Sequence, residues 1–356
     1  MNRPIDDELD GFAPLTRERD PFVDLVAVRS VNYTFEHDSP SLPNMTPQVS
    51  IGLPVYNGQR YLREAIESIL GQSFGDFELI ICDNASTDAT PEICVEFEHQ
   101  DGRVRYNRNK ENIGAAANYG RVYELSTAPY FKWAAGDDIL GPDFLDICVK
   151  ALDDDQSTVL ATTELQLIDD IGTPVPFHDT LTEYIAGAGD RYRPVKEARN
   201  LASPVAHQRF ADIVLHMIWY YQIYGVIRAE ALAKTSLHGS YPGSEKVLMA
   251  ELALLGRYYI APEPLFFNRV HSGHPTNPRT EGAVTYMDPK AHVGVKFAEG
   301  RVVQGYLRAI SRAPISAGQK MACLWAVVRK VSEPDNLKKL VIPGPNNYLG
   351  IGRKRS

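Results

Sequence analysis

The stretch "ELIICDNASTDAT", residues 78–90, decides the fold class. Four apolar residues run directly into Asp83 and Asn84, and a Ser/Thr/Asp cluster follows. Such a run is typical of a buried strand that ends in a polar loop. The next residues, "ATPEICVEFEHQ" at 89–100, have the pattern of a helix with Pro91 near its start. A strand, a loop and a helix in this order are the repeating unit of a parallel α/β sheet.

The same alternation continues on both sides of this stretch. We expect an α/β fold with a mostly parallel sheet and helices on both faces, built from strands at 48–57, 77–82, 102–109 and 129–138 and helices at 58–73, 89–100 and 113–126. Ligands of such sheets bind beyond the carboxyl ends of the strands. Asp83 and Asp137 both follow strands, so they are predicted to meet at one edge as parts of a site.

Composition limits the function and the compartment. The chain has 356 residues, 44% hydrophobic and 23% charged, and these fractions are typical of a globular protein. Its net charge of −8 argues against nucleic-acid binding. The N-terminus lacks the pattern of a secretory signal, and no apolar run reaches the ~18 residues that span a bilayer. The four scattered cysteines suggest core thiols in a reducing compartment. We therefore expect a cytoplasmic protein.

Charge is distributed unevenly between the two ends. Residues 1–48 hold nine acidic residues and four arginines, and residues 301–356 hold eleven Lys/Arg against Glu333 and Asp335. The basic end predicts an acidic partner, such as the inner face of a membrane, or else a solvated helical cap. A stripe formed by Met321, Leu324, Trp325 and Val328 suits either an interfacial helix or core packing.

Three motifs together resemble one enzyme family. The segments "VSIGLPVYNGQRYLREAIESILGQSFGDFELIICDNASTDAT", "NKENIGAAANYG" and "WAAGDD" are similar in order and spacing to family 2 glycosyltransferases with the GT-A fold. The resemblance implies transfer of a sugar, with inversion, from a UDP, GDP or dTDP sugar to a hydroxyl of a glycan or lipid-linked acceptor. It also implies an N-terminal extension (1–47), a catalytic domain (48–275, divided into a donor part at 48–145 and an acceptor part at 146–275) and a helical, basic C-terminal extension (276–356).

The resemblance assigns donor-binding roles to particular residues. Asp83 would accept a hydrogen bond from the nucleotide base, although an aspartate here also suits a turn or a helix N-cap. Arg269 would reach the diphosphate. The remaining donor-binding residues are expected to be Pro54, Tyr56, Asn57 and Asn112, together with Asp137.

A divalent metal ion is the expected cofactor. Mg²⁺ or Mn²⁺ would offset the charge that develops on the diphosphate leaving group, and both ions accept carboxylate and phosphate oxygens. Asp137 is the principal predicted ligand, with Asp138 and His271 as further ligands. Ala135 stands where the family's usual first acid lies, which places strict metal dependence in question.

The acceptor side should supply a general base. Glu245 opens a predicted helix and resembles the family's base, although glutamate is also favoured in the first turn of any helix. Glu251 is the second choice. Trp219, Tyr221 and Tyr224 are candidates for a wall that stacks on acceptor sugars, or for core residues.

Three alternative functions were weighed. A catalytically idle nucleotide-sugar-binding partner is motivated by Ala135. A sugar nucleotidyltransferase should open with a Gly-rich loop and a basic residue, and "LPVYNG" has neither. Ser73 lies in a G-x-S-x-G pattern, but it follows a predicted helix and precedes a strand, which is the wrong context for a hydrolase nucleophile.

Overall fold

The computed structural model describes residues 46–175, 200–217, 219–271 and 298–334. The strands are β1 (Val49–Val55), β2 (Phe77–Asp83), β3 (Val104–Arg108), β4 (Tyr130–Trp133), β5 (Ile139–Leu140), β6 (Thr158–Ile168), β7 (Pro174–Val175), β8 (Val226–Arg228) and β9 (Arg257–Arg269). The helices are α2 (Leu62–Leu70), α3 (Thr90–Gln100), α4 (Ala115–Glu124), α5 (Phe144–Asp154), α7 (Ala206–Leu215), α8 (Ala229–Leu232), α9 (Ser244–Leu255), α11 (Ala298–Arg312) and α12 (Ala317–Val331), with a 3₁₀ turn η1 at Tyr221–Tyr224.

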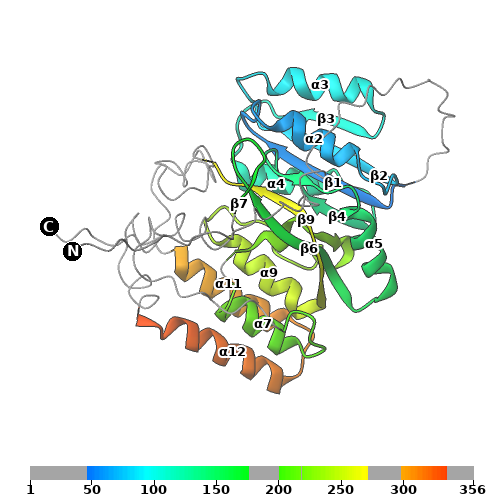
Figure 1. Ribbon diagram of the computed structural model, residues 1–356. Coiled ribbons are helices and arrows are strands. Elements are labelled where there is room, and N and C mark those ends of the chain that lie inside the picture. The colour runs from blue at the N-terminus through cyan, green and yellow to red at the C-terminus, as the bar shows by residue number, and fades with distance from the viewer. Residues whose placement is uncertain (1–45, 176–199, 218, 272–297, 335–356) are drawn as a thin grey trace, which may run out of the picture. The chain divides into compact units, whose positions relative to one another are not determined.

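The described strands form one mixed sheet in the order β3-β2-β1-β4-β8-β6-β9-β5, with β7 paired to β6 (Figure 1). The half from β3 to β4 is wholly parallel, as the alternation of strands and helices predicted. In the other half only the β6–β9 pair is parallel, so the sheet as a whole is less parallel than expected. The reason is that β4, β6 and β8 pair antiparallel there, without the regular strand–helix repeat of the first half.

The opening stretch forms the fully buried strand β2. Its residues alternate between two apolar clusters, because successive side chains of a strand point to opposite faces. Leu79 and Ile81 pack with α2, α3 and α5, whereas Ile80 and Cys82 pack in the cluster that also includes residues of α4, α7 and α9. The helices therefore cover both faces of the sheet, as predicted (Figure 1).

Helix α4 approaches strand β1 very closely. A Cβ atom added to Gly52 would lie only 2.7 Å from the Val122 side chain and 2.9 Å from the Phe131 ring. No other residue type fits at Gly52 without a shift of its neighbours, since real Cβ contacts do not come this close. Gly52 thus allows α4 to pack closely on strand β1.

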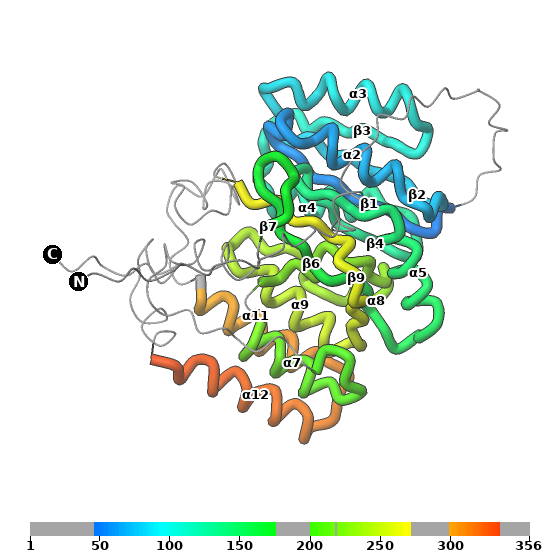
Figure 2. The backbone as a smooth tube through the Cα atoms, in the orientation of Figure 1, coloured from blue at the N-terminus to red at the C-terminus, as the bar shows by residue number. Residues whose placement is uncertain are grey.

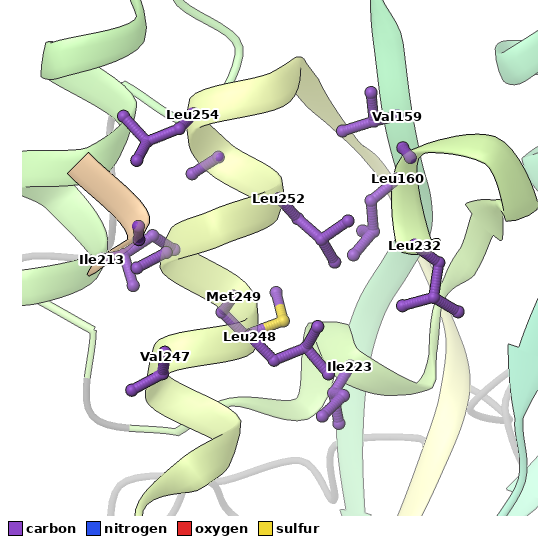
Figure 3. Close-up of a cluster of buried hydrophobic side chains, with 14 of the residues drawn as sticks. Val159, Leu160, Ile213, Ile223, Leu232, Val247, Leu248, Met249, Leu252 and Leu254 are labelled. Carbon is purple, nitrogen blue, oxygen red and sulfur yellow. The ribbon is translucent and has the colours of Figure 1, made fainter. Parts of the chain in front are cut away.

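Helix α9 is buried on every side. Val247, Leu248, Met249, Leu252 and Leu254 project from it in different directions into one apolar cluster (Figure 3). Helix α7, helix α11 and strand β6 contact α9 and cover it. A helix that is apolar all round is expected to be internal, and α9 is the centre of this half of the protein.

The two C-terminal helices belong to the same helical layer. Helix α11 packs on α9, and α12 packs on α7 and α11, so α12 is the outermost helix of this group (Figures 1 and 2). The predicted boundary at residue 275 and the predicted N-terminal extension (1–47) fall almost wholly outside the described residues. Within the described part, no helix combines the length and the apolar character needed to cross a bilayer.

All four cysteines are buried and unpaired. Burial raises the thiol pKa to about 12 at Cys82, Cys94 and Cys148 and to about 11 at Cys323. The thiols act as small apolar core groups, as expected from their apolar neighbours in the sequence.

The burial of α9 predicts a large effect of one substitution. Leu252→Ala should lower the free energy of unfolding by about 2–5 kcal/mol, because Leu252 is fully buried and its loss leaves a cavity. Urea denaturation followed by circular dichroism measures the change. Leu307→Ala is the matched control, because Leu307 lies on α11 and is 44% exposed, so a change below about 0.5 kcal/mol is expected. Equal losses in the two variants would contradict this assignment of the core.

Candidate functional site

The loops that follow β1 and β2 are joined by hydrogen bonds. The Asn57 backbone N–H donates to Ser86 Oγ at 2.9 Å, and Asn57 Oδ1 accepts from the Thr87 N–H at 2.9 Å. Asn57 has φ of 51°, in the left-handed region that asparagine tolerates better than most residues. Pro54 lies within β1 and Tyr56 follows it, 41% exposed on the loop. The predicted nucleotide wall is thus held by the Ser/Thr cluster of the opening stretch.

A pair of asparagines extends this arrangement to the loop after β3. Asn84 Nδ2 donates to Asn112 Oδ1 at 2.8 Å, and Asn84 Oδ1 accepts from the Ile113 N–H at 2.9 Å. Asn112 Oδ1 also accepts from the N–H of Gly114, whose φ of 89° turns the chain into α4. The asparagine of the N-x-G motif therefore shapes the rim itself. Its predicted contact with the donor stays a prediction.

Asp83 is fully buried at the end of β2. Its Oδ1 accepts from the Ser86 N–H at 2.8 Å, which is the turn role that the sequence left open. Its Oδ2 accepts from the Tyr106 hydroxyl at 2.8 Å and lies 3.4 Å from Arg108 Nε. The carboxylate is thus fixed by three protein groups. Recognition of a nucleotide base by Asp83 stays a prediction.

Asp137 and Asp138 were predicted to end the strand at 129–138, but β4 already stops at Trp133, so both lie in the loop between β4 and β5. Gly136 places this loop over the end of β1, since a Cβ there would lie 3.6 Å from the Val55 side chain. Asp83 ends β2, and the loop of Asp137 follows β4. Strands β2 and β4 lie on either side of β1, so the distance between them is about 10 Å, twice the spacing of neighbouring strands. The two carboxylates belong to the same edge of the sheet, as the sequence predicted.

Asp138 is buried and attaches this loop to the end of β9. Its Oδ1 accepts from Asn268 Nδ2 and from the Arg269 N–H, both at 2.9 Å. Burial and the neighbouring charge of Asp137 raise the pKa of the Asp138 carboxyl. Its Oδ2 is buried and has no hydrogen-bond partner within the described part of the chain.

Arg269 is a positioning residue in this structure. Its buried guanidinium donates to the Asp137 carbonyl at 2.9 Å and to the Glu64 carboxylate at 2.6 Å. It also donates to the carbonyls of Asp169 and Asp170 and stacks on the Tyr61 ring at 4.7 Å. All three guanidinium nitrogens donate to protein groups. The predicted contact of Arg269 with a donor diphosphate stays a prediction.

His271 meets Asp137 across 134 residues of sequence. Its Nε2 lies 3.1 Å from Asp137 Oδ2, and its ring packs at 4.9 Å from the Tyr61 ring. A carboxylate beside an imidazole fits a divalent cation that takes its other ligands from phosphate and water. Asp138, the residue after Asp137, has a buried Oδ2 without a hydrogen-bond partner among the described residues. Within the described ranges, no three His, Cys, Asp or Glu side chains converge on one point. Metal binding by Asp137, Asp138 and His271 stays a prediction.

The predicted acceptor aromatics are half-buried around η1. Tyr221 and Tyr224 stack on Phe266 at 6.3 and 5.6 Å, and the Tyr224 hydroxyl lies 3.2 Å from that of Tyr119. Trp219, also half-buried, precedes the same turn. These side chains are therefore partly core, as the alternative interpretation held. Their contact with an acceptor stays a prediction.

The buried lysine Lys132 connects this region to β4. Its Nζ donates to the carbonyls of Trp133 and Tyr224 and lies 4.6 Å from the Phe144 ring centroid. Burial lowers the pKa of Lys132 to about 7.

Glu245 lies in the first turn of α9, as predicted. Burial raises the pKa of its carboxyl, while neighbouring Lys246 opposes the shift. The loop that leads into α9 contacts helix α4, because the His238 ring lies 4.7 Å from the Tyr119 ring. Burial raises the pKa of the Tyr119 hydroxyl. Glu251, the second choice, accepts from the N–H and hydroxyl of Ser236 and so stabilises this loop.

Some residues of the site were not predicted. Tyr61 and Glu64 hold Arg269, and Tyr119 connects the donor rim with the loop before α9. From the sequence, Tyr61 was predicted to be an ordinary core residue on the apolar face of the helix at 58–73. Lys132, a charged residue inside an apolar strand, was a sequence signal for a buried polar group.

The comparisons with known proteins agree with this geometry. Residues 50–174 match the model of Glycosyl transferase family 2. EpsE of Bacillus subtilis (strain 168), provisionally named a glycosyltransferase, is 35% identical over 130 residues, which are 36% of this chain and 47% of EpsE. Chondroitin synthase of Escherichia coli is 35% identical over 124 residues, 35% of this chain and 18% of that protein. The chain thus spans about half or less of these relatives' length.

Solved structures show the same fold over a longer part of the chain. TarS 1–349 of S. aureus in complex with UDP-GlcNAc has a TM-score of 0.55 at 14% identity, covering 80% of this chain and 72% of that one. The predicted GT-A fold is therefore confirmed. The match to Glycosyl transferase family 2 over residues 50–174 agrees with the family that the motifs predicted.

The role of Arg269 can be tested by a matched pair of substitutions. Arg269→Met should lower the free energy of unfolding by about 3 kcal/mol, because buried carbonyl acceptors lose a charged donor. Arg60→Met is the control, since Arg60 also stacks on Tyr61 but its salt bridge with Asp170 is exposed, so at most about 1 kcal/mol is expected. Urea denaturation of both variants measures the difference. Similar losses would contradict a special role for Arg269.

Proposed function

We propose that this chain is a glycosyltransferase that moves a sugar from a nucleoside diphosphate to an acceptor hydroxyl with inversion at the anomeric carbon. The observation that carries the proposal is the 3.1 Å contact of Asp137 Oδ2 with His271 Nε2 at the carboxyl edge of the parallel strands. This edge is where ligands of open α/β sheets bind. The family of residues 50–174 supports the reaction class.

Asp137 and His271 would hold a divalent cation against the donor diphosphate. The cation would supply Lewis-acid stabilisation of the charge that appears on the leaving group. Arg269 and Asp138 would hold the Asp137 loop still while this happens, because their hydrogen bonds fix the backbone on both sides of it. Because Asp137 and His271 would remain as ligands, the missing acid at Ala135 would weaken the affinity for the cation rather than abolish it.

Glu245 would remove the proton from the acceptor hydroxyl as that oxygen attacks. A carboxylate with a raised pKa is a better base than an exposed glutamate, because its affinity for the proton is closer to that of the hydroxyl. The acceptor would be a growing glycan or a lipid-linked sugar that rests against Tyr221 and Tyr224. A UDP sugar is the first donor to test, because TarS, of the same fold, was solved with UDP-GlcNAc.

Removing the proposed metal ligand tests the donor site. Asp137→Asn should lower Mn²⁺-dependent release of nucleoside diphosphate at least about a hundredfold, because several kcal/mol of charge stabilisation are lost. A panel of UDP, GDP and dTDP sugars with and without Mn²⁺ measures this release. Asp76→Asn is the control, since Asp76 precedes β2 at the opposite edge of the sheet. Donor binding without turnover in the unaltered protein would instead favour the idle partner.

Removing the proposed base tests the acceptor side. Glu245→Gln should keep the thermal shift caused by the donor and lower transfer about 10²–10⁴-fold. In the unaltered protein, transfer should rise with pH through the raised pKa of Glu245, since only the ionised carboxylate accepts the proton. Glu251→Gln in the same helix is the control and should retain transfer. A normal rate in Glu245→Gln would exclude this residue as the base.

A further inference from the structure

The outer face of α12 presents an apolar stripe that no described part of the chain covers. Met321, Trp325 and Val328 are 65%, 71% and 52% exposed, and their spacing of four and three residues places them on one side of the helix. Single exposed apolar residues are common on protein surfaces, but a tryptophan between two further apolar residues in one row is not.

This stripe is not needed for the folding of α12. The opposite face carries Cys323, Ala326 and Val327, which are buried, and α12 packs on α7 and α11. The helix start is capped by Ser316, whose hydroxyl accepts from the Gln319 N–H at 3.3 Å. The sequence left interfacial contact and core packing as alternatives for this helix. Core packing describes its inner face, and interfacial contact stays open for its outer face.

The charge around the stripe favours an anionic occupant. Arg329, exposed on α12, follows Val328 directly. Residues 301–334, the described part of this end, carry six Lys/Arg against one acidic residue, Glu333, in a chain whose total charge is −8. Basic residues beside an apolar row gain about 1 kcal/mol each near an anionic lipid surface, and tryptophan prefers the headgroup region of a bilayer.

The size of the stripe also favours a lipid surface over a second protein. A stable protein interface buries about 800 Å² on each partner, whereas three side chains in one row supply a few hundred Å² at most. A bilayer accepts a narrow apolar row without a complementary shape, because its headgroups rearrange around the side chain.

We propose that the outer face of α12, formed by Met321, Trp325, Val328 and Arg329, docks this protein on an anionic membrane surface. The inner face of α12 remains packed on the helical layer around α9, so docking leaves the fold unchanged. The site of docking is therefore separate from Asp137 and Glu245, and it can fail or succeed independently of the proposed transferase activity.

Vesicle sedimentation of the full chain tests the proposal. We expect binding to vesicles of equal parts phosphatidylcholine and phosphatidylglycerol that is about tenfold or more stronger than binding to phosphatidylcholine alone. The double variant Met321→Ser/Trp325→Ser should lose binding about tenfold or more, because two apolar side chains no longer enter the lipid. Arg329→Glu should weaken binding to the anionic vesicles about tenfold.

Controls separate this result from loss of folding or of activity. Ile171→Ser removes an 83% exposed apolar residue in the turn before β7, distant from α12 in Figure 1, and should bind vesicles normally. The double variant should keep the circular dichroism spectrum and the donor hydrolysis of the unaltered chain. Unchanged vesicle binding by the double variant would overturn the proposal. So would a dimer, seen by analytical ultracentrifugation, that dissociates in the double variant while vesicles bind neither protein.

Discussion

The candidate site depends on the hydrogen bonds that join the loop after β4 to the end of β9. Asp138 accepts from the backbone of Arg269, and Arg269 in turn donates to the carbonyl of Asp137. Arg269 is the donor in both bonds, which join segments about 130 residues apart and bury the Asp138 carboxyl and the Arg269 guanidinium. Buried polar groups are costly unless they are hydrogen-bonded, so each segment supplies partners that the buried groups of the other need. The meeting of His271 with Asp137 follows from that constraint.

A second set of buried contacts joins the two halves of the sheet. Lys132, on the last parallel strand, donates to the carbonyl of Tyr224, and its ammonium lies over the Phe144 and Phe266 rings. Phe266 also supports Tyr221 and Tyr224. The predicted acceptor aromatics thus pack on β9, and the Tyr224 backbone is joined to β4, which leads to the loop of Asp137. Core packing therefore sets the distance between these two predicted parts of the site.

The part of the fold that was predictable is the part with local signals. Apolar runs, Pro91 and the polar cluster at 83–90 predicted β1 to β4 and their helices, and the motifs predicted the family. The directions of β6, β8 and β9 were not predictable, because long-range pairing leaves no local pattern. The same limit applies to Arg269. Its residue type suits a phosphate ligand or a buried anchor equally well, and its contacts with Tyr61 and Glu64, some 200 residues away in sequence, leave no local pattern that could be recognised.

The burial of all four thiols has a practical consequence for spectroscopy. Thiol reagents attack the thiolate, and the native sulfurs are both enclosed and hard to ionise near neutral pH. A maleimide dye or a nitroxide would therefore react with a cysteine introduced on the surface and leave the native ones untouched. The wild-type background is thus suited to distance measurements between chosen pairs of labels, with no need to remove cysteines from the core first.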